Sequence, residues 1–178
     1  MRYVALFRGI NVGKAKRIAM ADLRALLGKL GYTDVRTLLN SGNAVFTATG
    51  AAPKIARRIR SEVARKLGVD ALVIVKSARD VANIIAGNAL AKVATDHSRL
   101  LVAVTNEPGA IAELGKFADR EWGGERLHVG RDAAYLWCAD GILESKVAPA
   151  LLSELGGTGT TRNWATLNKI HALMQAGS

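Results

Sequence analysis

The hydrophobic pattern of the first eighty residues alternates between short β-rich runs and amphipathic helical stripes. β-branched and aromatic runs predict four strands, at residues 2–8, 35–39, 44–48 and 72–76. Apolar residues at i, i+3, i+4 and i+7 predict two helices, from Met20 to about Leu30 and from Pro53 to Leu67. The resulting order, β-α-β-β-α-β, is that of a ferredoxin-like unit, in which a split βαβ arrangement forms an antiparallel sheet.

The same order of elements starts again after residue 98 and then becomes incomplete. Strands are predicted at residues 99–105, 126–129 and 133–138, and helices at residues 108–118 and near 145–155. The glycine- and threonine-rich residues 156–161 are interpreted as a loop that leads to a last helix from Asn163 to about Gln175, so no fourth strand is expected. We therefore predict an α+β protein of two tandem ferredoxin-like units, the second degraded, with a C-terminal helix.

The predicted organisation has three parts that pack as one compact body. Residues 1–80 are the first ferredoxin-like unit, residues 81–98 a connecting helix and linker, and residues 99–178 the second unit with the C-terminal helix. Ser77 is expected to cap the connecting helix, because serine is a favoured residue at that position.

Positive charge is concentrated in the first half of the chain. The formal net charge is +10, and residues 1–80 carry 16 Lys and Arg against 5 Asp and Glu. A one-sided basic field attracts polyanions such as phosphates, acidic partners or nucleic acid. The alternative interpretation is that the excess reflects solubility and a compositional bias toward Arg and Ala.

Cysteine and histidine usage argues against disulfides and metals. The single cysteine, Cys138, allows no internal disulfide, which is typical of a reducing cytoplasm. His97, His128 and His171 have no second ligand at metal spacing, so we expect neither a metal site nor a cofactor. The apolar run at residues 3–7 is too short for a signal peptide or a membrane span, and we expect a cytoplasmic protein without a membrane partner.

Two polar loops are predicted to meet at one edge of the first sheet. In a ferredoxin-like unit the first and second strands run the same way, so the end of the first strand lies beside the turn after the second. Free N–H groups at the start of the following helix would favour a phosphate or carboxylate there. The alternative is that both loops are ordinary turns. The candidate ligand-binding residues are Arg8, Asn11, Lys14, Lys16, Asn40, Ser41 and Asn43.

A second candidate site opens the last predicted helix. Arg162 and Asn163 follow a glycine-rich segment, and a guanidinium can bind a carboxylate or phosphate through two hydrogen bonds. The alternative is ordinary capping by Thr161 or Asn163, with Trp164 in the core.

Several enzyme classes do not fit the motifs. Residues 9–15 are one residue short of a phosphate-binding P-loop, and Ala15 stands where Ser or Thr would hold magnesium. There is no Gly-x-Ser-x-Gly elbow and no dinucleotide fingerprint after a strand. The polar loops lack Asp, Glu and His, so an acid or base would have to come from elsewhere, for example Asp22 or Glu144. Ser145 beside Lys146 is interpreted as a helix cap rather than a nucleophile. Whether the protein is an enzyme stays open.

The same motifs resemble a known family. Its signature is the Arg-Gly-Ile-Asn-Val-Gly run at residues 8–13, and further similarities are Leu-Asn-Ser-Gly-Asn at 39–43, Ser-Lys at 145–146 and Thr-Arg-Asn-Trp at 161–164. Together they resemble the bacterial domain-of-unknown-function family DUF1697 over nearly the whole chain. One departure is Gly13-Lys14-Ala15, where members often carry a second glycine. The resemblance implies two ferredoxin-like units in a small cytoplasmic protein and no established activity.

These observations lead to hypotheses from different functional classes. The first is binding of a small phosphorylated or nucleotide-like molecule at the edge formed by the first loop and the first hairpin. The alternative is an RNA-binding module that uses the basic N-terminal half, since ferredoxin-like sheets can stack bases on exposed aromatics. A scaffold role is a third class, without a positive feature in its favour. The oligomeric state is not predicted.

Overall fold

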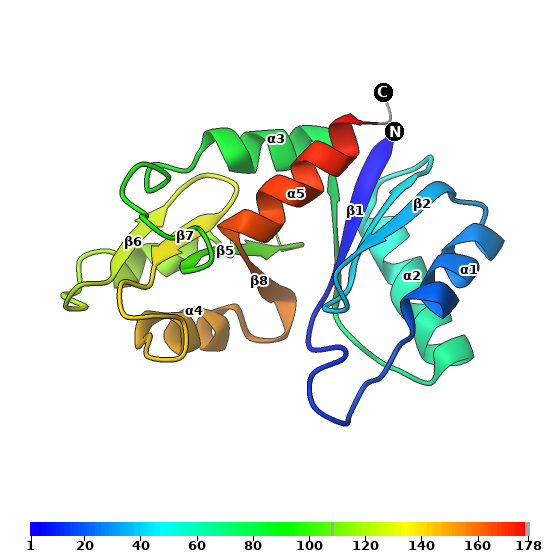
Figure 1. Ribbon diagram of the computed structural model, residues 1–178, viewed down its shortest axis with the longest axis horizontal. Coiled ribbons are helices and arrows are strands. Elements are labelled where there is room, and N and C mark those ends of the chain that lie inside the picture. Colours follow the sequence, from blue (N-terminus) through cyan, green and yellow to red (C-terminus); the bar gives the residue numbers. More distant parts are fainter. Residues whose placement is uncertain (108, 177–178) are drawn as a thin grey trace. The chain divides into compact units, whose positions relative to one another are not determined.

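The computed structural model describes residues 1–107 and 109–176, and it divides into two compact units (Figure 1). Unit 1 comprises Met1–Val81 together with the chain from Ile170 onward, and unit 2 comprises Ala82–Lys169. The end of the C-terminal helix therefore groups with the first unit, whereas the sequence analysis assigned it to the second. Among the described residues, no helix combines the length and the apolar character needed to cross a bilayer.

Unit 1 contains a four-stranded antiparallel sheet in the order β2-β3-β1-β4. β1 and β2 both pair antiparallel with β3, so they run in the same direction, as the loop argument requires. β2 is the exposed edge strand and is largely polar, which protects the sheet from pairing with other chains. The strands are β1 (Arg2–Phe7), β2 (Thr33–Leu38), β3 (Asn43–Thr47) and β4 (Val73–Ser77).

Two helices cover one face of this sheet, α1 (Met20–Lys29) and α2 (Ala52–Leu67) (Figure 1). Their apolar stripes form the core with the strand residues on that face, and the fully buried contributors include Leu23, Ile59 and Phe46. α2 ends where predicted, because Gly68 adopts the left-handed conformation that a helix C-cap requires.

The connecting helix α3 (Ala78–Ala86) begins at a capping box. The Asp80 N–H donates to Ser77 Oγ at 3.2 Å, and the Ser77 N–H donates to Asp80 Oδ2 at 2.9 Å. The predicted cap at Ser77 is therefore confirmed.

Unit 2 contains a second four-stranded antiparallel sheet, in the order β6-β7-β5-β8. One face packs against the helices α4 (Val147–Leu155) and η1 (Ala112–Phe117), a 3-10 helix, and a short 3-10 turn, η2 (Gly156–Thr158), follows α4. α5 (Trp164–Gln175) follows the last strand. The strands are β5 (Leu100–Thr105), β6 (Arg126–Val129), β7 (Ala134–Trp137) and β8 (Gly159–Asn163).

The prediction that the second unit lacks a fourth strand is wrong. β8 pairs with β5 along its whole length, from Gly159 opposite Thr105 to Asn163 opposite Leu101. Its sequence, Gly-Thr-Thr-Arg-Asn, has weak strand propensity, and the pairing comes from a non-local partner that is apolar and fully buried. Both units therefore have four antiparallel strands, and the second is not degraded in this respect.

The predicted helix at residues 108–118 is a 3-10 helix over part of that range. Pro108, its expected start, lies outside the described residues. Leu114 and Phe117 are buried three residues apart, a spacing that a 3-10 helix places on one side. Gly115 within so short a segment disfavours a regular α-helix.

Candidate functional site

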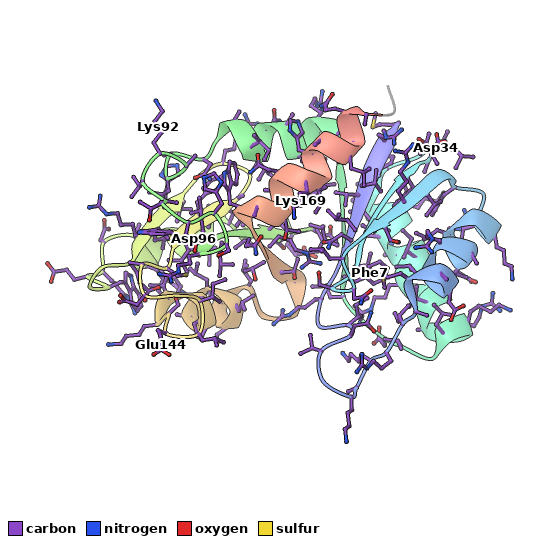
Figure 2. The ribbon with its side chains drawn as sticks, viewed as in Figure 1. Phe7, Asp34, Lys92, Asp96, Glu144 and Lys169 are labelled. Carbon is purple, nitrogen blue, oxygen red and sulfur yellow. The ribbon has the colours of Figure 1, made fainter. Side chains whose placement is uncertain are left out.

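The first loop and the first hairpin turn lie against each other at one end of the unit 1 sheet. Phe7, the last residue of β1 (Figure 2), donates its N–H to the Gly42 oxygen at 2.9 Å. Asn11 Nδ2 donates to the Asn40 oxygen at 2.7 Å. The two loops that the topology argument placed together are thus joined by hydrogen bonds.

Asn11 is the residue that holds the first loop in shape. Its Oδ1 accepts from the Ile18 N–H at 2.8 Å, and Nδ2 donates to the Ile18 oxygen at 2.8 Å and to the Asn40 oxygen. Its own N–H donates to the Lys16 oxygen at 3.0 Å. Both hydrogens of the amide group are used in these contacts, so Asn11 positions the loops and has no remaining side-chain donor for a ligand.

Asn43 and Ser41 stabilise the hairpin from inside the turn. Asn43 is fully buried, and its Nδ2 donates to the Leu38 oxygen at 2.8 Å and to Ser41 Oγ at 3.3 Å. Ser41 and Asn40 are exposed. Arg8 is partly buried, and its backbone N–H bonds the Leu72 oxygen at 3.0 Å. Of the turn residues 39–43, Leu39, Asn40 and Ser41 are exposed, and only the last two of these carry polar side chains.

Backbone strain is concentrated in these two loops. In the described part of the chain, four non-glycine residues have positive φ, and three of them lie here: Asn11 at 56°, Lys16 at 50° and Leu39 at 59°. A branched residue such as leucine in this region is unusual. Strained backbone persists only where surrounding contacts hold it, and it tends to occur at functional sites.

Three cations project from the first loop. Lys14, Lys16 and Arg17 are exposed, and none of them forms an ion pair with a described residue. Arg17 was not among the residues predicted from the sequence, although it continues the basic run that begins at Lys14.

One carboxylate outside the loops influences this edge. Asp70 accepts hydrogen bonds from Arg60 Nε at 2.6 Å and Nη2 at 3.0 Å. These bonds lower the pKa of Asp70, and the charges of Arg60 and Lys16 lower it further. Asp70 therefore lies within the electrostatic reach of Lys16, a relationship that the sequence did not reveal.

A shallow pocket of about 300 Å³ lies where the loops meet the start of α1. Its walls include Asn11, Arg17 and Asn40 as well as residues 18–20, the last of which begins α1. Ala19 occupies the N-cap position and makes no side-chain hydrogen bond to the helix. The first-turn N–H groups thus have no side-chain cap, and a helix N-terminus of this kind favours an anion.

Arg162 and Asn163 belong to unit 2, where they are the last two residues of β8. Asn163 Oδ1 accepts from the Thr166 N–H at 2.8 Å, which is an N-cap of α5, and Trp164 is buried. Arg162 Nη1 donates to the Thr161 oxygen at 2.8 Å. Burial lowers the pKa of Arg162 to about 10, so its guanidinium is still charged at neutral pH.

Ser145 likewise acts as a cap, in this case of α4. Its Oγ donates to Glu125 Oε2 at 2.5 Å and accepts from the Ala148 N–H at 3.0 Å, while the Lys146 N–H donates to Glu125 Oε1 at 2.8 Å. The two carboxylates suggested as acids or bases from outside the polar loops are both exposed. Asp22 lies on α1. Glu144 lies on the surface of unit 2 (Figure 2). Residues 1–107 and 109–176 contain no group of three or more His, Cys, Asp or Glu side chains arranged to hold a metal ion.

Comparisons with known proteins agree with this fold. The chain is similar in structure to a conserved bacterial protein, SP0830, from Streptococcus pneumoniae, with a TM-score of 0.79 and 24% sequence identity. That alignment covers 97% of this chain and 98% of the other. No protein with a curated description matches. The profile described as "Protein of unknown function (DUF1697)" matches residues 1–135. The chain therefore belongs to the DUF1697 family.

Proposed function

We propose that unit 1 binds a small anionic ligand, phosphate- or nucleotide-like, where the first loop meets the first hairpin. The observation that carries this proposal is the Asn11 side chain, which bonds to both loops and fixes them as one surface. Because these hydrogen bonds hold the backbone of both loops, less of the backbone has to be ordered when a ligand binds, which lowers the entropic cost of binding.

The groups that would contact the ligand are of two kinds. Lys14, Lys16 and Arg17 supply positive charge from the loop, and the uncapped first turn of α1 supplies N–H donors at the pocket. The Asp70 carboxylate near Lys16 is already held by Arg60, so its repulsion of an anion is reduced. No general acid or base lies among the pocket-lining residues, which favours a binding role over catalysis.

The finer description of the fold is also a proposal. Two ferredoxin-like units in tandem are supported by the matching strand orders, β2-β3-β1-β4 and β6-β7-β5-β8. We propose a cytoplasmic location on the basis of the single, buried cysteine, whose thiol has a pKa raised by burial.

A thermal-shift screen with phosphate, pyrophosphate and nucleotides tests the function. A ligand at a hundred times its dissociation constant stabilises the folded protein by about 2.7 kcal/mol, which is readily measured. The triple variant Lys14→Gln/Lys16→Gln/Arg17→Gln should lose the shift. The matched control Lys29→Gln/Lys54→Gln/Arg57→Gln removes the same charge from α1 and α2 and should keep it. An absence of any shift, or an equal shift in both variants, would contradict the proposal.

RNA binding is the second candidate, because α2 exposes a row of arginines and lysines. Two of these are already paired, Arg60 with Asp70 and Arg65 with Glu62. Phe7 and Phe46 are fully buried, so neither offers a stacking surface for bases. A salt titration separates the candidates. RNA binding should give a log affinity that falls steeply and linearly with log salt concentration, because about one counterion is released for each phosphate neutralised, whereas a small anion neutralises few charges and should give a shallow slope.

A further inference from the structure

A groove lies between α1 and α2, on the outer side of unit 1. Its volume is about 600 Å³, which lies within the range of ligand-binding clefts. Positions three, four and seven apart on each helix line it, so the groove follows both helices. The lining residues are Asp22, Ala25, Leu26, Lys29, Leu30, Arg58, Glu62, Arg65, Lys66 and Leu67.

The floor of the groove is apolar and incompletely covered. Ala25 is exposed, and Leu30 and Leu67 are only partly buried although both pack against the unit 1 core. An apolar strip between two helices is the kind of surface that a third amphipathic helix covers. Burial of this strip by a partner would supply the hydrophobic part of the binding free energy.

The rim of the groove carries an excess of positive charge. Four of the lining residues are Lys or Arg and two are Asp or Glu. Glu62 is held by Arg65 through two hydrogen bonds, at 3.2 Å and 2.5 Å. The two lysines, Lys29 and Lys66, are exposed and form no ion pair with a described residue.

We propose that this groove binds an acidic amphipathic helix of a partner protein. The apolar floor accepts the helix's hydrophobic stripe, and Lys29 and Lys66 pair with carboxylates that flank it. A second copy of this chain does not offer an acidic helix of this kind, because no helix among the described residues contains more than one acidic residue.

The groove chemistry also differs from that of a nucleic-acid surface. Asp22 and Glu62 would face the phosphates, and the nearest aromatic ring, Tyr32, is buried with the Arg58 guanidinium 5.8 Å from its centre. Nucleic-acid surfaces instead combine uninterrupted cations with exposed rings.

Fluorescence anisotropy with a designed peptide tests this inference on the full-length protein. The probe is a labelled helical peptide with leucine at i, i+3, i+4 and i+7 and glutamate elsewhere. The control peptide has the same composition with its leucines scrambled. We expect the amphipathic peptide to bind more tightly than the scrambled one, with an affinity that falls as salt is raised.

Two protein variants with equal charge change provide the decisive comparison. Lys29→Glu/Lys66→Glu should weaken binding by about tenfold at low salt, because each substitution replaces an attraction to a carboxylate of the peptide by a repulsion. Lys54→Glu/Arg57→Glu lies on α2 outside the groove lining and should change it little. Ala25→Glu, at an exposed helical position, should also weaken binding by placing a carboxylate over the floor.

Three results would overturn the inference. The first is equal binding of the two peptides. The second is an equal loss of affinity in both charge-reversal variants, which would indicate a general basic field. The third is that the peptide does not bind but a single-stranded RNA oligonucleotide does. If the RNA also binds more weakly to Lys29→Glu/Lys66→Glu, the groove is a nucleic-acid site.

Discussion

Asn11 Nδ2 and the main-chain oxygen of Asn40 lie 2.7 Å apart, although the two residues are 29 positions apart in the chain. This contact converts two separate loops into a single surface beside the start of α1. The contact is possible because β1 and β2 run in the same direction. The end of β1 therefore lies beside the turn that follows β2.

Removal of the Asn11 side chain should loosen that surface. Glycine tolerates the φ of 56°, so Asn11→Gly removes three side-chain hydrogen bonds without straining the backbone. We expect the unfolding free energy to fall by about 1–3 kcal/mol. Asn11→Ala should cost about 1 kcal/mol more, because alanine is strained at positive φ. Chemical denaturation measures both values. Hydrogen exchange should show faster exchange of the Ile18 amide; unchanged exchange in both variants would mean that Asn11 does not hold the loop.

Gly42 is a position of the hairpin that packs tightly against Phe7 and Ile10. A Cβ at this position would lie 2.6 Å from Ile10 Cδ1 and 2.8 Å from Phe7 Cβ, at a φ of 88°. Gly50 also has positive φ, at 106°, but a Cβ there would meet no heavy atom within 4 Å. Gly42→Ala should therefore destabilise the protein by about 1–3 kcal/mol more than Gly50→Ala, because only the first adds a steric clash to the backbone strain. Equal losses in thermal or urea unfolding would show that the loops are not closely packed.

The sequence predicted most elements of unit 1 because local signals and tertiary contacts agree there. Leu23, Leu26 and Leu27 lie on one helical stripe, and all three are buried. β8 was missed because its strand character comes from pairing with β5 and not from its own residues. At the candidate site, strand topology predicted which loops meet, but residue type did not separate positioning from binding. Asn11 and Asn43 look like ligand-binding amides in the sequence, whereas their side chains bond to the backbone.

Tyr135 should make unit 2 sensitive to alkaline pH. Its hydroxyl donates to the Ile84 oxygen at 2.6 Å, and burial, with a smaller effect from Asp132, raises the pKa from 10.0 to about 12. The folded state holds this proton more tightly than the unfolded state, so the stabilisation is complete below about pH 10 and is lost as pH rises toward 12. The loss should reach about 2–3 kcal/mol.

Comparison with Tyr135→Phe isolates this effect from the titration of other groups. The variant should be less stable than the parent at neutral pH by about 1 kcal/mol, and this order should reverse between pH 10 and pH 12, because only the parent loses about 2–3 kcal/mol over that range. Urea unfolding at a series of pH values gives the difference directly. A constant difference across that range would mean that the phenol titrates normally.

Ser145 should affect stability and not chemistry. Because its Oγ caps α4, Ser145→Ala should lower the unfolding free energy by about 1–2 kcal/mol. Its hydroxyl is also bound to Glu125, and the residue is buried. A fluorophosphonate probe for activated serines should therefore leave the protein unlabelled, as judged by intact mass. Labelling at Ser145 would instead identify a nucleophile and would contradict the capping assignment.

The most direct test of the central claim is an NMR titration of ¹⁵N-labelled protein with pyrophosphate. The account predicts saturable shifts in the amides of loop residues 9–18 and of the first turn of α1, with a weakened response in Lys14→Gln/Lys16→Gln/Arg17→Gln. Shifts confined to the arginines of α2, or a linear and unsaturated response everywhere, would contradict an anion site built by Asn11 at this edge.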